Sequence, residues 1–277
     1  MRIALISLIA ALSLSSPAPA DYEIHLKEST INWSTGVIVA RGHSSLALDE
    51  SGQPRAYHSR IPTSINKARI EAYQQAREKA LENLIAALKS IRVEPDTMLA
   101  HLISNDTFAQ KGLAELINRV RVKEYPAAFL GSRCEARITL GDLIASIPYD
   151  FPANDFPLRE DVPIATKYSS LIIDGRDLDI LPMLFPAVYA EDGLEIYGRH
   201  YVDSRYAVRY GMVSYCFTED EAIRSRRAGD RPYFTTALKS IKGCPVIAER
   251  DVRKILSSPY TINNLKKCRV IIILTRK

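Results

Sequence analysis

The sequence predicts an α+β protein of two domains, each with helices packed on a mainly antiparallel sheet. The order strands, helices, strands runs through residues 21–147, and the second half repeats this class of structure. Such an order places helices on one face of an antiparallel sheet. A proline-rich segment separates the halves, and 277 residues, 47% of them hydrophobic, suffice for two ordinary cores.

Residues 1–20 have the features of a secretory signal peptide. A basic start at Arg2 precedes an apolar run, and Ala18-Pro19-Ala20 forms a small-residue cleavage site. We predict cleavage after Ala20 and a periplasmic location. The run of about 12 apolar residues is too short to span a bilayer, so no membrane span is predicted, with an uncleaved anchor as the alternative. The first cysteine is Cys134, so a lipid anchor at the new N-terminus is not expected.

The first domain, residues 21–147, is predicted to begin with a strand over Asn32–Gly42 that leads into a hairpin at Asp49–Gly52. A long helix follows, with Thr63 or Ser64 as its N-cap. Its apolar stripe recurs at spacings of three and four and comprises Ile65, Ala68, Ala72, Ala76, Ala80, Leu84, Leu88 and Ile91. The alanine end of this stripe should allow close approach to a sheet.

The rest of the first domain returns to strands after shorter helices. Thr97–Asn118 is predicted to hold one or two helices, with a break and a Ser or Asn cap near Ser104-Asn105-Asp106. Strands are predicted at Val120–Tyr125 and Arg133–Leu140. The second of these alternates apolar and polar residues, which is typical of a sheet with one solvated face.

Residues 148–164 are predicted to be an extended linker. Four prolines fall in this region, and proline cannot donate a ladder hydrogen bond. The aromatic residues among them predict a strap that lies against a domain surface. The alternative is a packed loop inside one larger domain.

The second domain, residues 165–277, is predicted to contain a buried strand at Ser170–Asp174 and a hairpin at Ala187–Tyr197 that turns around Asp192-Gly193. The remaining elements are a strand at Tyr210–Phe217, a helical turn at Glu219–Ser225, strands at Arg231–Ile241 and Pro245–Ala248, a helix starting at Asp251–Leu256, and a last strand at Cys268–Leu274. The Val and Ile run of the last strand belongs in the middle of a sheet.

The sequence resembles secreted bacterial proteins related to flagellar assembly protein T and the flagellar-sheath lipoproteins, as a non-lipidated member. The first half carries this resemblance in Trp33, Gly36, Ala40-Arg41-Gly42, Lys67-Ala68-Arg69 and Ala80-Leu81-Glu82-Asn83-Leu84. The second half resembles a module that accompanies such domains, through Leu171-Ile172-Ile173-Asp174-Gly175-Arg176, Leu184-Phe185-Pro186, Asp192-Gly193 and Tyr197-Gly198. The resemblance implies a periplasmic structural or assembly role and carries over no catalytic residue.

No catalytic motif is present, and no cofactor or metal is predicted. The chain lacks a Gly-x-Ser-x-Gly elbow, a His-Glu-x-x-His helix and a phosphate-binding loop, and its five histidines are scattered. The best acidic group is Asp174, Asp177 and Asp179. Asp174 and Asp177 could serve as the acid and base of a cell-wall hydrolase. The alternative is an ordinary Asp-Gly turn whose side chains bond the backbone.

Two further groups of residues are candidate sites. Four cysteines in an exported chain favour at most one disulfide, with Cys244 and Cys268 as the preferred pair and buried free thiols as the alternative. A basic cluster is formed by Arg224, Arg226, Arg227 and Arg231. It is either an interaction surface for an anionic partner or a solvated loop.

We therefore expect a non-catalytic periplasmic structural or assembly protein, linked to the flagellum or the cell envelope, that binds an envelope or flagellar protein. A cell-wall hydrolase that uses Asp174 and Asp177, or an envelope ligand-binding module, is the alternative. Nucleic acid is not an expected partner, because the 37 Lys and Arg residues are interspersed with 32 Asp and Glu residues. The sequence sets no oligomeric state.

Overall fold

A computed structural model describes residues 21–125, 131–157 and 166–276. The predicted signal peptide, residues 1–20, lies outside the described residues, as does the later part of the predicted linker. No helix within the described ranges is long and apolar enough to cross a membrane.

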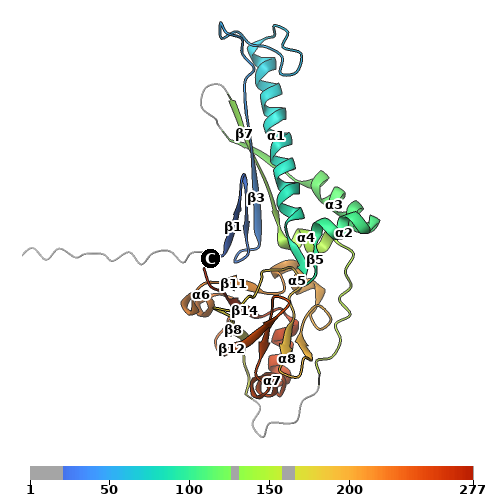
Figure 1. The fold of residues 1–277 in the computed structure, drawn as a ribbon, viewed down its shortest axis with the longest axis vertical. Helices are drawn as coiled ribbons and strands as arrows, with labels where there is room; N and C mark the ends of the chain where they lie inside the picture. Colours follow the sequence, from blue (N-terminus) through green and yellow to red (C-terminus); the bar gives the residue numbers. More distant parts are fainter. Residues whose placement is uncertain (1–20, 126–130, 158–165, 277) are drawn as a thin grey trace, which may run out of the picture.

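The N-terminal domain is an antiparallel sheet with helices on one face (Figure 1). The sheet order is β1-β2-β3-β7-β6, and every pairing in it is antiparallel. Its strands are β1 (Glu23–Leu26), β2 (Ser29–Asn32), β3 (Val37–Ser45), β6 (Val122–Tyr125) and β7 (Gly131–Thr139). The helices are α1 (Ile65–Lys89), α2 (Leu99–Asn105), α3 (Thr107–Arg119) and α4 (Leu140–Ser146), and a small hairpin joins β4 (Arg92–Glu94) to β5 (Thr97–Met98).

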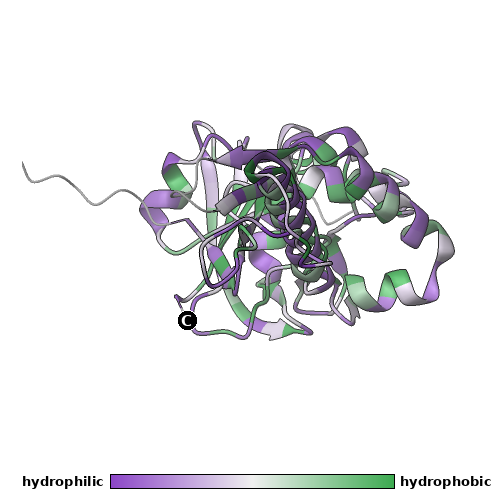
Figure 2. Ribbon diagram, turned by 90° about the horizontal axis from the view of Figure 1, so that it is seen from above, coloured by the Kyte–Doolittle hydropathy of each residue, from purple (hydrophilic) through white to green (hydrophobic). Residues whose placement is uncertain are grey.

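The predicted amphipathic helix is confirmed as α1, and Ser64 is its N-cap, accepting a hydrogen bond from the backbone N–H of Lys67. The alanine end of its buried stripe packs closely on β3, as expected. A Cβ atom added to Gly42 would lie 2.1 Å from the carbonyl oxygen of Ala76. We call α1 with β3 and β7 the arm, because together they extend away from the C-terminal domain (Figure 1). Seen along the arm, hydrophilic residues predominate on α1 and the loops around it (Figure 2).

Several details of this domain differ from the prediction, and β1, β2, β4, β5 and α4 were not predicted. The strand begins at Val37, because Trp33 to Gly36 form the turn between β2 and β3. The predicted hairpin at Asp49–Gly52 is reduced to a turn flanked by a single antiparallel bridge, between Leu48 and Pro54, in the loop before α1. The cap of the second short helix is Asp106, whose side chain accepts from the backbone N–H groups of Phe108 and Ala109.

The C-terminal domain is also α+β, but its seven-stranded sheet is mixed and not mainly antiparallel. In the order β10-β9-β13-β12-β8-β14-β11, the pairings β11 with β14, β14 with β8, β8 with β12, and β13 with β9 are parallel. The strands are β8 (Ser170–Asp174), β9 (Val188–Ala190), β10 (Glu195–Tyr197), β11 (Ser214–Cys216), β12 (Pro232–Ile241), β13 (Cys244–Ile247) and β14 (Val270–Ile273). The prediction was wrong here because a short apolar run does not reveal the direction of its neighbours.

Helices connect these strands. They are α5 (Ser204–Tyr210), α6 (Glu219–Arg224), α7 (Glu249–Leu256) and α8 (Pro259–Lys266). The hairpin of β9 and β10 and the helix α6 are as predicted. Strand β14 is an interior strand between β8 and β11, but it lies next to the edge and not in the middle of the sheet. Tyr210 ends α5 and does not begin a strand, and α8 was not predicted.

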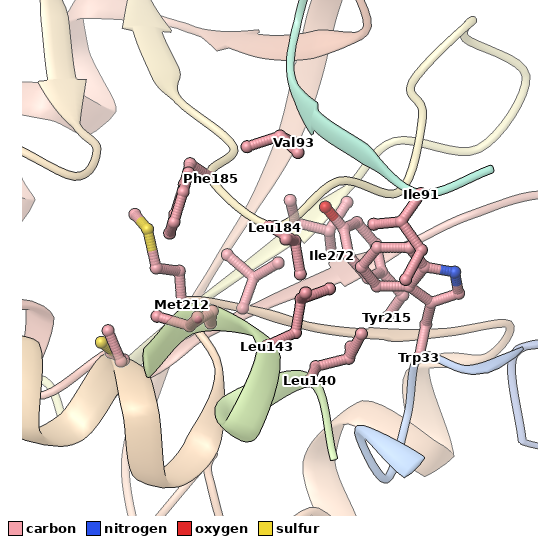
Figure 3. Close-up of a cluster of buried hydrophobic side chains, with 14 of the residues drawn as sticks. Trp33, Ile91, Val93, Leu140, Leu143, Leu184, Phe185, Met212, Tyr215 and Ile272 are labelled. Atoms are coloured by element: carbon pink, nitrogen blue, oxygen red, sulfur yellow. The ribbon is translucent and has the colours of Figure 1, made fainter. Parts of the chain in front are cut away.

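One continuous apolar core joins the two domains. Trp33, Leu140 and Leu143 of the first domain meet Leu184 and Tyr215 of the second in this cluster (Figure 3). The rings of Trp33 and Tyr215 pack edge to face at 5.8 Å. Aromatic packing of this kind adds about 0.5–1.5 kcal/mol to the effect of burial.

Polar contacts cross the same boundary. The backbone N–H groups of Leu184 and Phe185 donate to the carbonyls of Arg92 and Val93, and Ser34 Oγ donates to the carbonyl of Tyr215 at 2.6 Å. The described part of the linker lies against the second domain, as its aromatic residues predict. Tyr149 and Phe151 both pack on Phe185, and Phe156 packs on Tyr201.

Candidate functional site

The predicted acidic group lies in a turn after β8 in which Arg176 is hydrogen-bonded to Asp174. Arg176 donates to both carboxylate oxygens of Asp174, at 2.9 and 2.5 Å, and to Glu219 at 2.9 Å. These hydrogen bonds lower the pKa of Asp174. A general acid needs the opposite shift, because its proton must be held at neutral pH.

Asp177 has separate partners in the same turn. Its backbone N–H donates to Thr275 Oγ1 at 2.7 Å, and Thr275 Oγ1 lies 3.4 Å from its carboxylate. Its backbone is left-handed, with φ of 62°, a conformation that Asp tolerates in turns. The geometry of Asp174 and Asp177 is that of the ordinary turn and does not support an acid and base pair.

The predicted disulfide between Cys244 and Cys268 is absent: the described chain holds all four cysteines as buried free thiols. Cys244 opens β13, whereas Cys268 precedes β14. Strands β12 and β8 lie between these two strands, a separation of three strand spacings, or about 14 Å. A disulfide needs Cα atoms closer than about 7 Å, so the sheet order prevents this pairing.

The four arginines of the predicted basic cluster make different contacts. Arg224 pairs with Asp220 on α6 at 3.2 Å, and Arg231 lies over the ring of Tyr168. Arg226 and Arg227 line a cleft between the two domains. The four arginines thus have different surroundings, and the interaction surface for an anionic partner stays a prediction.

This cleft has a volume of about 740 Å³, and we call it the basic cleft. One wall comes from the turn at Trp33 to Gly36 and the start of α4. The opposite wall comes from the end of α5, the segment after α6 and the junction between α8 and β14. Its basic residues are Arg209, Arg226, Arg227, Lys267 and Arg269, and the described residues that line it include no Asp or Glu.

Arg227 forms the floor of the basic cleft. Its guanidinium donates to the backbone carbonyls of Tyr210, Gly211, Met212 and Cys268, and so joins the end of α5 to the start of β14. Burial lowers the pKa of Arg227. The hydrogen-bond partners of its guanidinium among the described residues are these four carbonyls, and none of the ion pairs found there involves it.

Neutral groups complete the lining. Hydroxyl groups come from Thr35 and Ser214, and aromatic rings from Trp33, Tyr206 and Tyr210. Burial raises the pKa of Cys268 to about 12 although Arg227 opposes this shift. The thiol therefore stays protonated and is not a nucleophile near neutral pH.

The sequence identified only part of this site. Arg226 and Arg227 stand out because they are adjacent, whereas Arg209, Lys267 and Arg269 are brought to them by the fold. A metal site is not formed by the described residues: within 21–125, 131–157 and 166–276, no group of three or more His, Cys, Asp or Glu side chains is placed to hold a metal ion.

A comparison with protein families gives a match to the second half of the chain. A family model described as Treponema pallidum Tp0624, second domain, matches residues 170–276, fewer than half of the 277 residues. The C-terminal domain, from β8 to the end of β14, is thus similar to that domain. No curated protein matches the chain.

Proposed function

We propose that this protein is a non-catalytic assembly protein of the bacterial periplasm, linked to the flagellum or the envelope, that acts by binding another protein. The observation that carries this proposal is the free edge of β1. Strand β1 pairs only with β2 among the described strands, and all four of its residues are exposed. An open strand edge with unpaired backbone groups is a template for strand addition by a partner.

The composition of β1 supports this role. Ile24 and Leu26 are 36% and 37% exposed, and β1 itself contains neither lysine nor proline, the residues that commonly protect a free edge. The register of β1 on β2 shows which backbone groups of β1 point away from β2. Leu26 lies opposite Ser29 across a two-residue turn, so His25 and Thr30 form a pair that is not hydrogen-bonded, and the backbone N–H of His25 points outward.

The test is a proline at this outward position. In His25→Pro, the strand keeps its hydrogen bonds to β2 and loses one outward donor. His25→Ala is the matched control, because it removes the same side chain and keeps the N–H. After cross-linking in the native host, we expect the wild type and His25→Ala to copurify with the same envelope protein and His25→Pro to lose it, with the free energy of unfolding changed by less than about 1 kcal/mol.

An unchanged set of copurified proteins from His25→Pro would contradict binding through the β1 edge. Cell-wall hydrolysis by the purified protein that disappears in Asp174→Asn would contradict the non-catalytic proposal and favour the hydrolase.

A further inference from the structure

The basic cleft contains cations that the described residues do not neutralise. In each of the three segments that form the wall from the second domain, a paired cation outside the cleft lies close in sequence to an unpaired cation that lines it. Arg205 pairs with Asp203, Arg224 with Asp220, and Lys266 with Asp155. Their counterparts Arg209, Arg226 and Lys267 form no ion pair with a described residue, and neither does Arg269. None of the three paired carboxylates, Asp203, Asp220 and Asp155, lines the cleft.

Like charges in a concave site repel one another, and the low-dielectric walls strengthen this repulsion. The lining of the cleft has five basic residues and, among the described residues, no acidic one. Arg227, one of the five, is held without a carboxylate partner among the described residues, a costly arrangement for a cation that is shielded from water. An anion in the cleft would relieve both effects.

The donors of the cleft indicate the kind of anion. Guanidinium groups present planar pairs of N–H donors that match phosphate oxygens, and lysine adds a point charge. The hydroxyl groups of Thr35 and Ser214 are further donors. A volume of about 740 Å³ exceeds the space needed for one phosphate ion and falls in the usual range for small-molecule sites. The rings of Tyr206 and Tyr210 offer an apolar surface to the rest of the ligand.

We propose that the basic cleft binds a ligand that carries phosphate groups, a role that does not depend on the β1 edge. Two sources share this chemistry: a soluble phosphorylated compound and the headgroup of an anionic phospholipid. Pyrophosphate is the probe for the first source, and vesicles of phosphatidylglycerol, compared with phosphatidylcholine, are the probe for the second. Citrate at the same charge tests carboxylate in place of phosphate.

Trp33 provides a direct readout. It is the single tryptophan of the chain, it lines the basic cleft, and its indole Nε1–H has no hydrogen-bond partner among the described residues. Titration at constant ionic strength should therefore change the fluorescence of Trp33 and saturate. Arg226→Gln and Lys267→Gln should each weaken pyrophosphate binding about tenfold, the loss expected for one charge-assisted hydrogen bond.

Arg224→Gln and Arg231→Gln are matched controls, because both arginines belong to the same stretch of sequence but do not line the cleft. We expect them to bind as the wild type does. Vesicle binding that is lost in Arg226→Gln, without pyrophosphate binding, would support the lipid source. The proposal is overturned if neither phosphate probe binds more tightly than citrate, or if Arg224→Gln weakens binding as much as Arg226→Gln.

Discussion

The acidic turn after β8 and the basic cleft are both dense in charge, but their charges are handled in opposite ways. In the turn, Nε and Nη2 of Arg176 donate to the two carboxylate oxygens of Asp174, and Nη2 also donates to Glu219. In the cleft, Arg226 and Lys267 have no acidic partner among the described residues. Charges that satisfy one another locally stabilise a turn, whereas charges left unpaired in a concave site remain available to a ligand.

The largest difference between the two regions should appear on removal of Arg227. Arg227→Ala leaves the carbonyls of Tyr210, Gly211, Met212 and Cys268 without their donor and opens a hole under the cleft. We expect a loss of about 3–5 kcal/mol in the free energy of unfolding, measured with urea. Arg226→Ala is the control and should cost less than about 0.5 kcal/mol. Equal losses of unfolding free energy in Arg227→Ala and Arg226→Ala would mean that the hydrogen bonds of Arg227 to these carbonyls do not stabilise the fold.

The next effect concerns the junction that shapes the cleft. A Cβ atom on Gly141 would lie 1.9 Å from the carbonyl oxygen of Val208, so Gly141→Ala forces α4 and α5 apart. We expect a cost of about 1–3 kcal/mol in urea unfolding and a change in the fluorescence of Trp33, which borders the same junction. A variant as stable as the wild type would show that the domains are not held at this distance.

A smaller effect is expected in the acidic turn. The hydrogen bonds from Arg176 lower the pKa of Asp174 in the folded state. A carboxyl group with a lowered folded pKa stabilises the protein above its unfolded pKa of about 4, and this contribution is lost as the pH falls through the folded pKa. Asp174→Asn should therefore cost under about 1 kcal/mol at pH 7 and nothing at low pH. A cost that persists at low pH would assign Asp174 a role other than this ion pair.

The buried thiols of Cys216 and Cys268 should not react with a thiol reagent while the protein is folded. Burial raises the pKa of Cys216 and of Cys268 to about 12, so neither should react with a thiol reagent at pH 8, despite the cations near Cys268. Four thiols should react after denaturation without reductant. If only two thiols react in the denatured protein, a disulfide is present, contrary to what the sheet order indicates.

The N-terminal domain was the easier half to predict from its sequence. The stripe of α1 and the alternation in β7 repeat over enough residues to fix both the element and its buried face. Strands β1 and β2 were missed or misplaced because each has only four residues. The proposed binding edge is therefore in the part of this domain with the weakest pattern.

The C-terminal domain and the basic cleft were harder to predict for a physical reason. Parallel pairing joins strands that are far apart in sequence, such as β8 and β14, and their short apolar runs look alike in either direction. The cleft collects Arg209, Arg226 and Arg269 from three connections of this sheet. Only the adjacent pair Arg226-Arg227 gave a signal, and the fold divides the apparent cluster around it.

The comparison between the acidic turn and the basic cleft is tested most directly by complementation of a deletion strain. The double variant Arg226→Gln/Lys267→Gln removes two unpaired cations, and Asp174→Asn/Asp177→Asn removes the two carboxylates, with protein levels checked for each. We predict that the acidic-turn variant restores motility and envelope integrity as the wild type does and that the cleft variant does not. Restoration by the cleft variant together with failure of the acidic-turn variant would contradict the account.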